Sequence, residues 1–86
     1  MNIRETLDAA GLVPAEFGEL CGVSKNMVYK WIKGAKPHAL REAKVNKILT
    51  ALARAVEDGE LPLASVGDTR VKKLQAVVIT NIKKAV

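Results

Sequence analysis

The sequence predicts a small all-α domain of four helices followed by a C-terminal helix. Three observations favour this fold class. Apolar residues recur with the 3.6-residue period of a helix, most regularly between residues 38 and 57. Glycine and proline interrupt the pattern at short intervals, as they do at helix ends. With 86 residues, of which 49% are hydrophobic, the chain is long enough for one domain and too apolar for general disorder.

The first two helices are predicted from the residues at their ends. Asn2 and Glu5 have the spacing of a capping box at the start of a helix over residues 2–10, and Gly11 can end it. Pro14 suits the first turn of a second helix, because the N–H that proline lacks has no helical partner there. We expect this second helix to extend to about residue 20.

The next two helices are also bounded by capping and breaking residues. Ser24 is a suitable N-cap for a third helix over residues 25–32, and Gly34 and Pro37 mark its end. A fourth helix is predicted over roughly residues 38–57. Its apolar stripe, which we expect to face the core, consists of Leu40, Val45, Ile48, Leu49, Leu52 and Val56.

The C-terminal part is predicted to be a separate amphipathic segment. Residues 1–58 would form the main domain, and residues 59–67, which contain two glycines and a proline, would form a linker. A final helix over about residues 69–84 would carry an apolar seam formed by Val71, Leu74, Val78 and Ile82. Since the run at 77–80 is β-branched, a strand at residues 76–80 remains an alternative.

The charges are unevenly distributed along the chain. The net charge is +5, from 14 Lys and Arg against 9 Asp and Glu. Residues 24–47 hold seven basic residues and one acidic residue, whereas residues 1–23 hold one basic and four acidic residues. A positive block inside a near-neutral chain is typical of a protein that binds a polyanion, although a solvated lysine-rich surface has the same composition.

Several functional classes are disfavoured by composition. The single cysteine, Cys21, excludes a disulfide within the chain and a thiolate metal site. No nucleophile–base pair, metal-ligand spacing or phosphate loop is present, and His38 is the only histidine, so we expect neither an enzyme nor a cofactor or metal site. No stretch is apolar and long enough for a signal peptide or a membrane span, so we expect a cytoplasmic protein with no membrane partner.

Residues 14–32 read PAEFGELCGVSKNMVYKWI, and they meet the requirements of two short helices that cross steeply after a tight turn. Gly18 is small where the helices approach each other, and Gly22 tolerates positive φ in the turn. Val23 can fill the gap after the turn, while Val28 and Trp31 can pack the second helix onto the first.

This segment resembles the helix-turn-helix of the Cro/repressor (Xre-type) family of small phage and bacterial transcriptional regulators. The resemblance covers Pro14 to Ile32, and the trailing WIKGAKP is similar to the exit from the family's recognition helix. The helical layout extends it to about residue 57 and implies a compact lambda-repressor-like fold. The chain departs from the family at Pro14, where many members have a glutamine that contacts phosphate.

The resemblance implies roles for individual residues. In the family, the N-terminal residues of the recognition helix contact base edges. The corresponding positions here are Ser24, Lys25, Asn26 and Tyr29. Asn26 could pair with adenine, and Lys25 could donate to guanine. The lysines expected to contact phosphate are Lys30, Lys33 and Lys36.

The sequence thus predicts a sequence-specific, double-stranded DNA-binding regulator, most simply a phage-type Cro-like repressor that binds a palindromic operator as a dimer. The seam at Val71, Leu74, Val78 and Ile82 is the expected dimer surface, and packing on the chain's own core is the alternative. A second hypothesis is an antitoxin or other protein-interaction module whose C-terminal segment binds a partner protein. RNA binding is less favoured because aromatic residues that could stack on bases are scarce.

Overall fold

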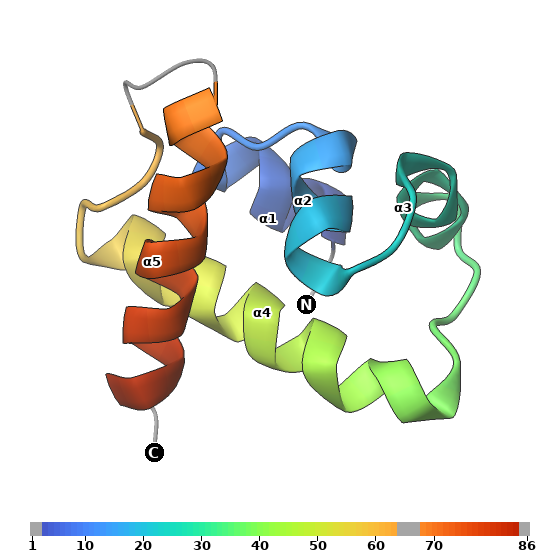
Figure 1. The fold of residues 1–86 in the computed structure, drawn as a ribbon. Coiled ribbons are helices and arrows are strands. Elements are labelled where there is room, and N and C mark those ends of the chain that lie inside the picture. The colour runs from blue at the N-terminus through green and yellow to red at the C-terminus, as the bar shows by residue number, and fades with distance from the viewer. Residues whose placement is uncertain (1–2, 64–67, 85–86) are drawn as a thin grey trace.

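The computed structural model describes residues 3–63 and 68–84, and these residues form five helices without a strand. The helices are α1 (Ile3–Ala10), α2 (Pro14–Cys21), α3 (Lys25–Ile32), α4 (Ala39–Glu57) and α5 (Asp68–Lys84), shown in Figure 1. The predicted all-α class is confirmed, and the region at 76–80 is helical rather than a strand. Asn2, expected as a cap, lies outside the described residues. None of the described helices is long and apolar enough to cross a membrane.

The helix ends follow from local hydrogen bonds. The Ser24 hydroxyl accepts a hydrogen bond from the backbone N–H of Met27 at 3.3 Å, as its predicted N-cap role requires. At the start of α2, the Glu16 carboxylate accepts from the backbone N–H of Val13 at 3.0 Å. His38 begins α4, where its Nδ1 accepts from the backbone N–H of Leu40 at 3.3 Å. Each bond satisfies a backbone donor that the helix itself leaves unpaired.

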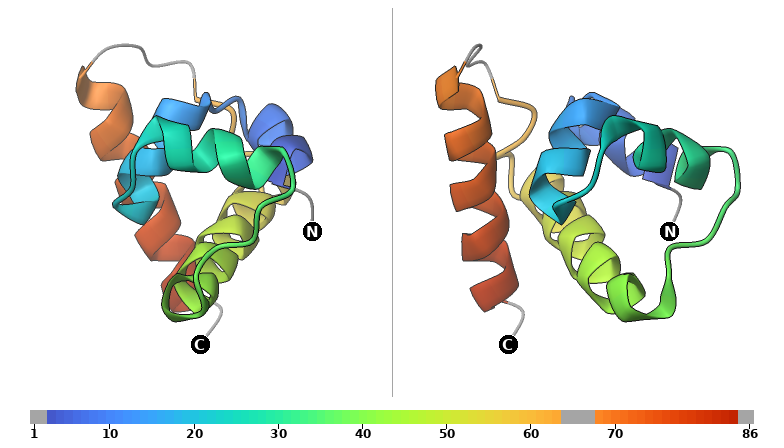
Figure 2. Two further views of the ribbon diagram at one scale, coloured as in Figure 1. Left: turned by 90° about the vertical axis from the view of Figure 1, so that its right-hand side faces the viewer. Right: turned by 45° about the vertical axis from the view of Figure 1, so that its right-hand side comes forward.

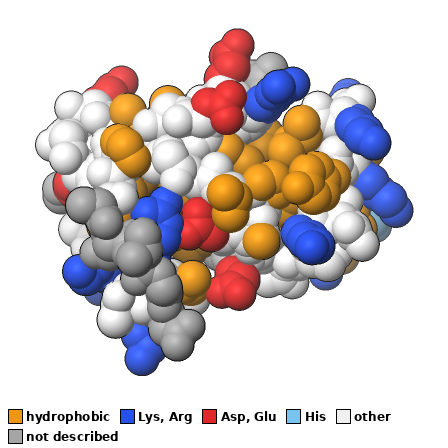
Figure 3. All heavy atoms as spheres, turned by 90° about the horizontal axis from the view of Figure 1, so that it is seen from above, with side chains coloured by type: hydrophobic (Ala, Val, Ile, Leu, Met, Phe, Trp, Pro, Cys, Tyr) orange, Lys and Arg blue, Asp and Glu red, His pale blue; other side chains and the backbone are white. Residues whose placement is uncertain are grey.

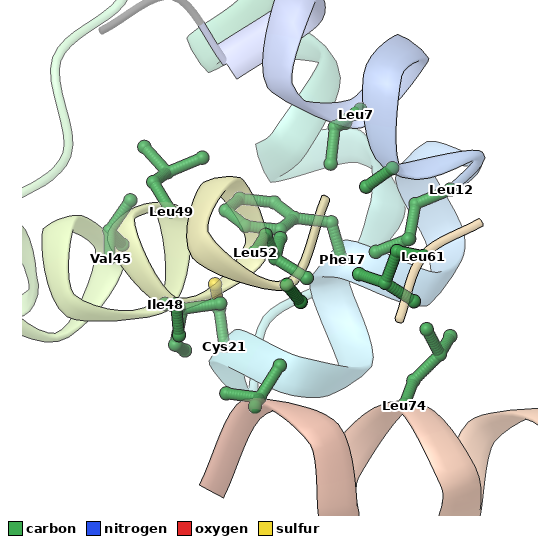
Figure 4. Close-up of a cluster of buried hydrophobic side chains, with 14 of the residues drawn as sticks. Leu7, Leu12, Phe17, Cys21, Val45, Ile48, Leu49, Leu52, Leu61 and Leu74 are labelled. Atoms are coloured by element: carbon green, nitrogen blue, oxygen red, sulfur yellow. The ribbon is translucent and has the colours of Figure 1, made fainter. Parts of the chain in front are cut away.

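One hydrophobic core joins the five helices. The long helix α4 contacts α1, α2 and α5, while α3 packs mainly on α2 (Figures 1 and 2). Figure 4 shows side chains from α2, α4 and α5 gathered into a single cluster that includes Phe17, Leu52 and Leu74. These three side chains are fully buried, and each such burial contributes about 1.5–3 kcal/mol.

The apolar stripe of α4 is shorter than its period predicts. Residues Val45 to Leu52 of the stripe are buried, but Leu40 is 88% exposed. The reason is visible in Figure 1, where the first turns of α4 extend beyond the other helices toward the loop that follows α3. The expectation that Leu40 faces the core is therefore wrong, because periodicity identifies an apolar face without showing what covers it.

The C-terminal part belongs to the same core. Leu61 is buried and Leu63 packs against the cluster, so residues 59–63 are not a free tether between two units. Leu74 and Val78 are buried in the core, and Ile82 is half-buried against it. The alternative of packing on the chain's own core thus holds for Leu74 and Val78, and these two side chains do not form the exposed dimer surface we expected.

Arg70 connects the start of α5 to the start of α2. Its guanidinium forms a salt bridge with Glu16, and it also donates to the backbone carbonyls of Leu63, at 3.0 Å, and Gly11. Both charged side chains are mostly buried. Because the fork of an arginine reaches three acceptors at once, this residue holds the start of α5 against the start of α2.

Candidate nucleic-acid interface

The crossing of α2 and α3 depends on two glycines. A Cβ atom on Gly18 would lie 2.7 Å from the backbone oxygen of Val23, closer than a side chain can approach. Gly22 ends α2 with φ of 75°, a left-handed conformation that favours glycine. The Val23 N–H then donates to the carbonyl of Gly18 at 2.8 Å, which closes the turn. The predicted roles of Gly18 and Gly22 are confirmed.

One face of α3 is fixed to the core by two side chains. Val28 and Trp31 are buried, and the Trp31 ring meets the Phe17 ring edge-on, with centroids 6.5 Å apart and planes at 81°. This geometry is favourable for aromatic pairs. The predicted core role of Trp31 is confirmed, and Ile32 is half-buried against the same core, while the other positions of α3 are exposed.

The residues predicted to read bases lie on that free surface. Lys25 and Asn26 are exposed together in the first turn of α3, directly after the N-cap Ser24. Tyr29 is 48% exposed one turn later. It lines a hollow of about 340 Å³ beside α1 and the start of α2, together with Pro14 and Ile32. Figure 3 shows hydrophobic side chains gathered on the upper face of the molecule, with both basic and acidic side chains around them.

The three lysines predicted to contact phosphate are exposed but spread over two elements. Lys30 and Lys33 lie at the end of α3 and Lys36 in the loop to α4. Lys36 lines a hollow of about 470 Å³ between α3 and the start of α4, opposite Ser24 and Met27. Within residues 3–63 and 68–84, none of these lysines forms a salt bridge, so their charges are available to an anionic ligand.

Sequence reasoning missed two basic residues that the fold brings to this surface. Arg41 lines the same hollow as Lys36, and the Lys44 ammonium lies beside the turn, 3.9 Å from where a Cβ on Gly22 would stand. Both belong to the basic block of the sequence. The loop between α3 and α4 returns the chain so that α4 runs beneath the turn (Figure 2). This path, which the sequence does not show, brings Arg41 and Lys44 near α3.

The pKa of the buried Cys21 thiol is affected by the charges of the same two basic residues. Burial raises its pKa from 9.0 to about 11, while the nearby charges of Lys44 and Arg41 act in the opposite direction. Desolvation dominates because a thiolate in an apolar environment loses its hydration. Cys21 is therefore a structural thiol beneath the turn and has no activated, nucleophilic character.

Comparison with known proteins adds no assignment. No protein-family model, curated protein or solved structure matches this chain. The functional interpretation therefore depends on the arrangement of these residues and on their chemistry.

Proposed function

We propose that the protein is a sequence-specific, double-stranded DNA-binding transcriptional regulator with a lambda-repressor-like helix-turn-helix. The observation that carries this proposal is the position of Lys25 and Asn26. Both are exposed in the first turn of α3, while Val28 and Trp31 fix its opposite face. A recognition helix needs exposed residues in its first turn and an opposite face fixed to the domain. Its first residues can then enter the major groove while the rest of the domain lies against the DNA backbone.

The chemistry of the exposed residues supports distinct roles. The Asn26 amide can pair with N6 and N7 of adenine, and the Lys25 ammonium can donate to O6 or N7 of guanine. Ser24 and Tyr29 would lie at the edges of the same contact. Phosphate contacts would come from both sides of α3, with Lys30, Lys33 and Lys36 as predicted and with Arg41 and Lys44 as additions.

A Cro-like repressor acting as a dimer on a palindrome remains the form of this proposal that the resemblance favours. One recognition helix reads only a few base pairs, so two copies are the usual source of specificity. The burial of Leu74 and Val78 means that a second copy would have to contact other residues. The same burial also weakens the antitoxin alternative, in which the C-terminal segment would be free for a partner.

The proposal is tested first by selecting bound sequences from a random pool of duplex DNA. We expect one enriched motif, with a two-fold repeat if two copies bind. On that site, Asn26→Ala should weaken binding by about 1–3 kcal/mol and relax the preference at one base pair. Titrations at several salt concentrations, followed by fluorescence anisotropy, would measure both effects.

Two lysine variants provide the comparison. Lys33→Ala should weaken binding to all sequences about equally. It should also reduce the slope of the logarithm of the binding constant against the logarithm of salt concentration by about one. Lys72→Ala removes an exposed lysine from α5, a helix separated from α3 by α2 (Figure 2), and should change neither property. Unchanged specific binding in Asn26→Ala would contradict the assignment of the base-reading surface, and failure to enrich any motif would contradict the proposed function.

A further inference from the structure

An apolar hollow lies where α2, α4 and α5 meet. It has a volume of about 340 Å³, and its apolar lining comes from Leu20, Ile48, Val78, Ile79 and Ile82. Ile79 is 53% exposed, although isoleucine is among the residues most often buried. The hollow is large enough to receive apolar side chains from another molecule, and none of the roles described above accounts for it.

The rim of this hollow is basic. Lys44 and Lys47 line it, and a second hollow of about 320 Å³ shares Lys47 and Ile82 and adds Arg54. Of the described residues that line the two hollows, none is acidic. Apolar walls with a cationic border favour a ligand that is itself apolar on one face and negatively charged beside it.

A buried acceptor lies at the second hollow. Asn81 lines it and is fully buried on α5. Its amide nitrogen donates to the backbone oxygen of Val77 at 2.9 Å and to Glu60 at 3.3 Å, but its Oδ1 accepts no hydrogen bond from the described part of the chain. An unpaired buried acceptor is costly, but this atom is closed off from solvent, so it is not itself a contact for a docked partner.

We propose that this α4–α5 face, defined by the two hollows and their rim, docks an acidic amphipathic segment of another protein. Apolar side chains of the partner would fill the hollows, and its carboxylates would pair with Lys44, Lys47 and Arg54. The simplest rival is a second copy related by a two-fold axis, and charge disfavours it. Such an axis would place two cationic rims in one interface, with no carboxylate in the lining of either hollow to pair with them.

The α4–α5 face is distinct from the surface proposed to bind DNA. In Figures 1 and 2, α5 and α3 lie on opposite sides of α2. Lys44 stands at the border, because it lines the hollow and also lies beside the turn before α3. Lys47 and Ile79 belong to the α4–α5 face alone, so substitutions there test docking separately from DNA binding.

The test uses the full chain and a fluorescein-labelled synthetic helical peptide with leucine on one face and glutamate on the others. We expect saturable binding by fluorescence anisotropy. In NMR spectra, the chemical shifts of backbone amides on α4 and α5 should change when the peptide binds. A matched peptide with lysine in place of glutamate should not bind. Lys47→Glu and Ile79→Asp should each weaken binding roughly five- to tenfold, since the first replaces an attraction by a repulsion and the second sets a charge against an apolar side chain. Circular dichroism would verify that both variants stay folded.

Lys30→Glu is the control, because it reverses an exposed charge on α3 and should leave peptide binding unchanged. Loss of peptide binding in Lys30→Glu would overturn the proposal, since the peptide would then act as a polyanion at the DNA-binding surface. No saturable binding, or equal binding to the Lys47 and Ile79 variants, would also overturn it. So would a homodimer in sedimentation experiments that Ile79→Asp dissociates, because the face would then belong to a second copy.

Discussion

The helices α3 and α5 pack against the same core but are held there in different ways. α3 has 8 residues and is anchored by Val28 and Trp31, the latter through its ring contact with Phe17. α5 has 17 residues, and its contacts are spread along its length. They comprise the Arg70 hydrogen bonds near its start, Leu74 and Val78 in the middle, and Asn81 near its end.

This difference shows how a short helix can present a large free surface. Since Val28, Trp31 and the half-buried Ile32 suffice to dock α3, most of its other positions are exposed and carry lysine, asparagine and tyrosine. α5 has no comparable anchor, and its stability is divided among smaller contacts. The expected consequence is that α3 is sensitive to single substitutions at its anchor, whereas α5 tolerates the loss of any one contact better.

The largest effect should follow from removing the anchor of α3. Trp31→Ala should destabilise the protein by about 3–5 kcal/mol, because it deletes a buried aromatic side chain and leaves a cavity beside Phe17. In a domain of this size such a loss is a large part of the whole stability. Urea denaturation followed by circular dichroism would measure it, and a cooperative, near-native transition would show that α3 is not docked by Trp31.

The next effect concerns the close approach of α2 and α3. Gly18→Ala should cost about 1–3 kcal/mol, because the new methyl group would collide with the backbone oxygen of Val23. Ala76→Ser enlarges an exposed position on α5 and should change stability by less than about 0.5 kcal/mol. Thermal denaturation of both proteins would compare them, and equal midpoints would contradict the tight crossing.

A smaller effect is expected for the arginine that fixes α5. Arg70→Lys keeps the charge, but a lysine ammonium cannot reach Glu16, Leu63 and Gly11 with the same fork. We expect a loss of about 1–2 kcal/mol, since two carbonyls would lose a charged donor. Hydrogen exchange would locate the change, and protection should fall at the start of α5 more than in α3. An equal loss of protection in α3 and α5 would contradict the role of Arg70 in holding α5.

The last effect appears only in alkaline solution and is absent at neutral pH. It is a change of stability with pH at Cys21, which lies between the two regions. Burial raises the pKa of its thiol to about 11, so in alkaline solution the native state keeps a proton that the unfolded chain has lost. The contribution of this thiol to stability is therefore complete below pH 9.0 and declines as the pH rises toward 11. Cys21→Ala should flatten that part of the pH profile. Slow alkylation of folded protein at pH 9 would support the assignment, and rapid alkylation would contradict it.

The sequence by itself determined where the helices begin and end and how α2 meets α3. Capping by Ser24, the left-handed Gly22 and the close approach at Gly18 depend on residues a few positions apart, so their physics is local. The exposed pair Lys25 and Asn26 follows from the same local pattern, because the buried positions of an eight-residue helix identify its free face.

Only the tertiary structure decided what covers each apolar face. Leu40 and Leu74 belong to equally regular helical patterns, yet one is exposed and the other is fully buried. The Arg70–Glu16 pair joins residues 54 positions apart, and Arg41 and Lys44 reach α3 only through the path of the loop. Periodicity predicts which face of a helix is apolar. Which element packs on that face depends on contacts between segments far apart in the sequence, and no local pattern predicts those contacts.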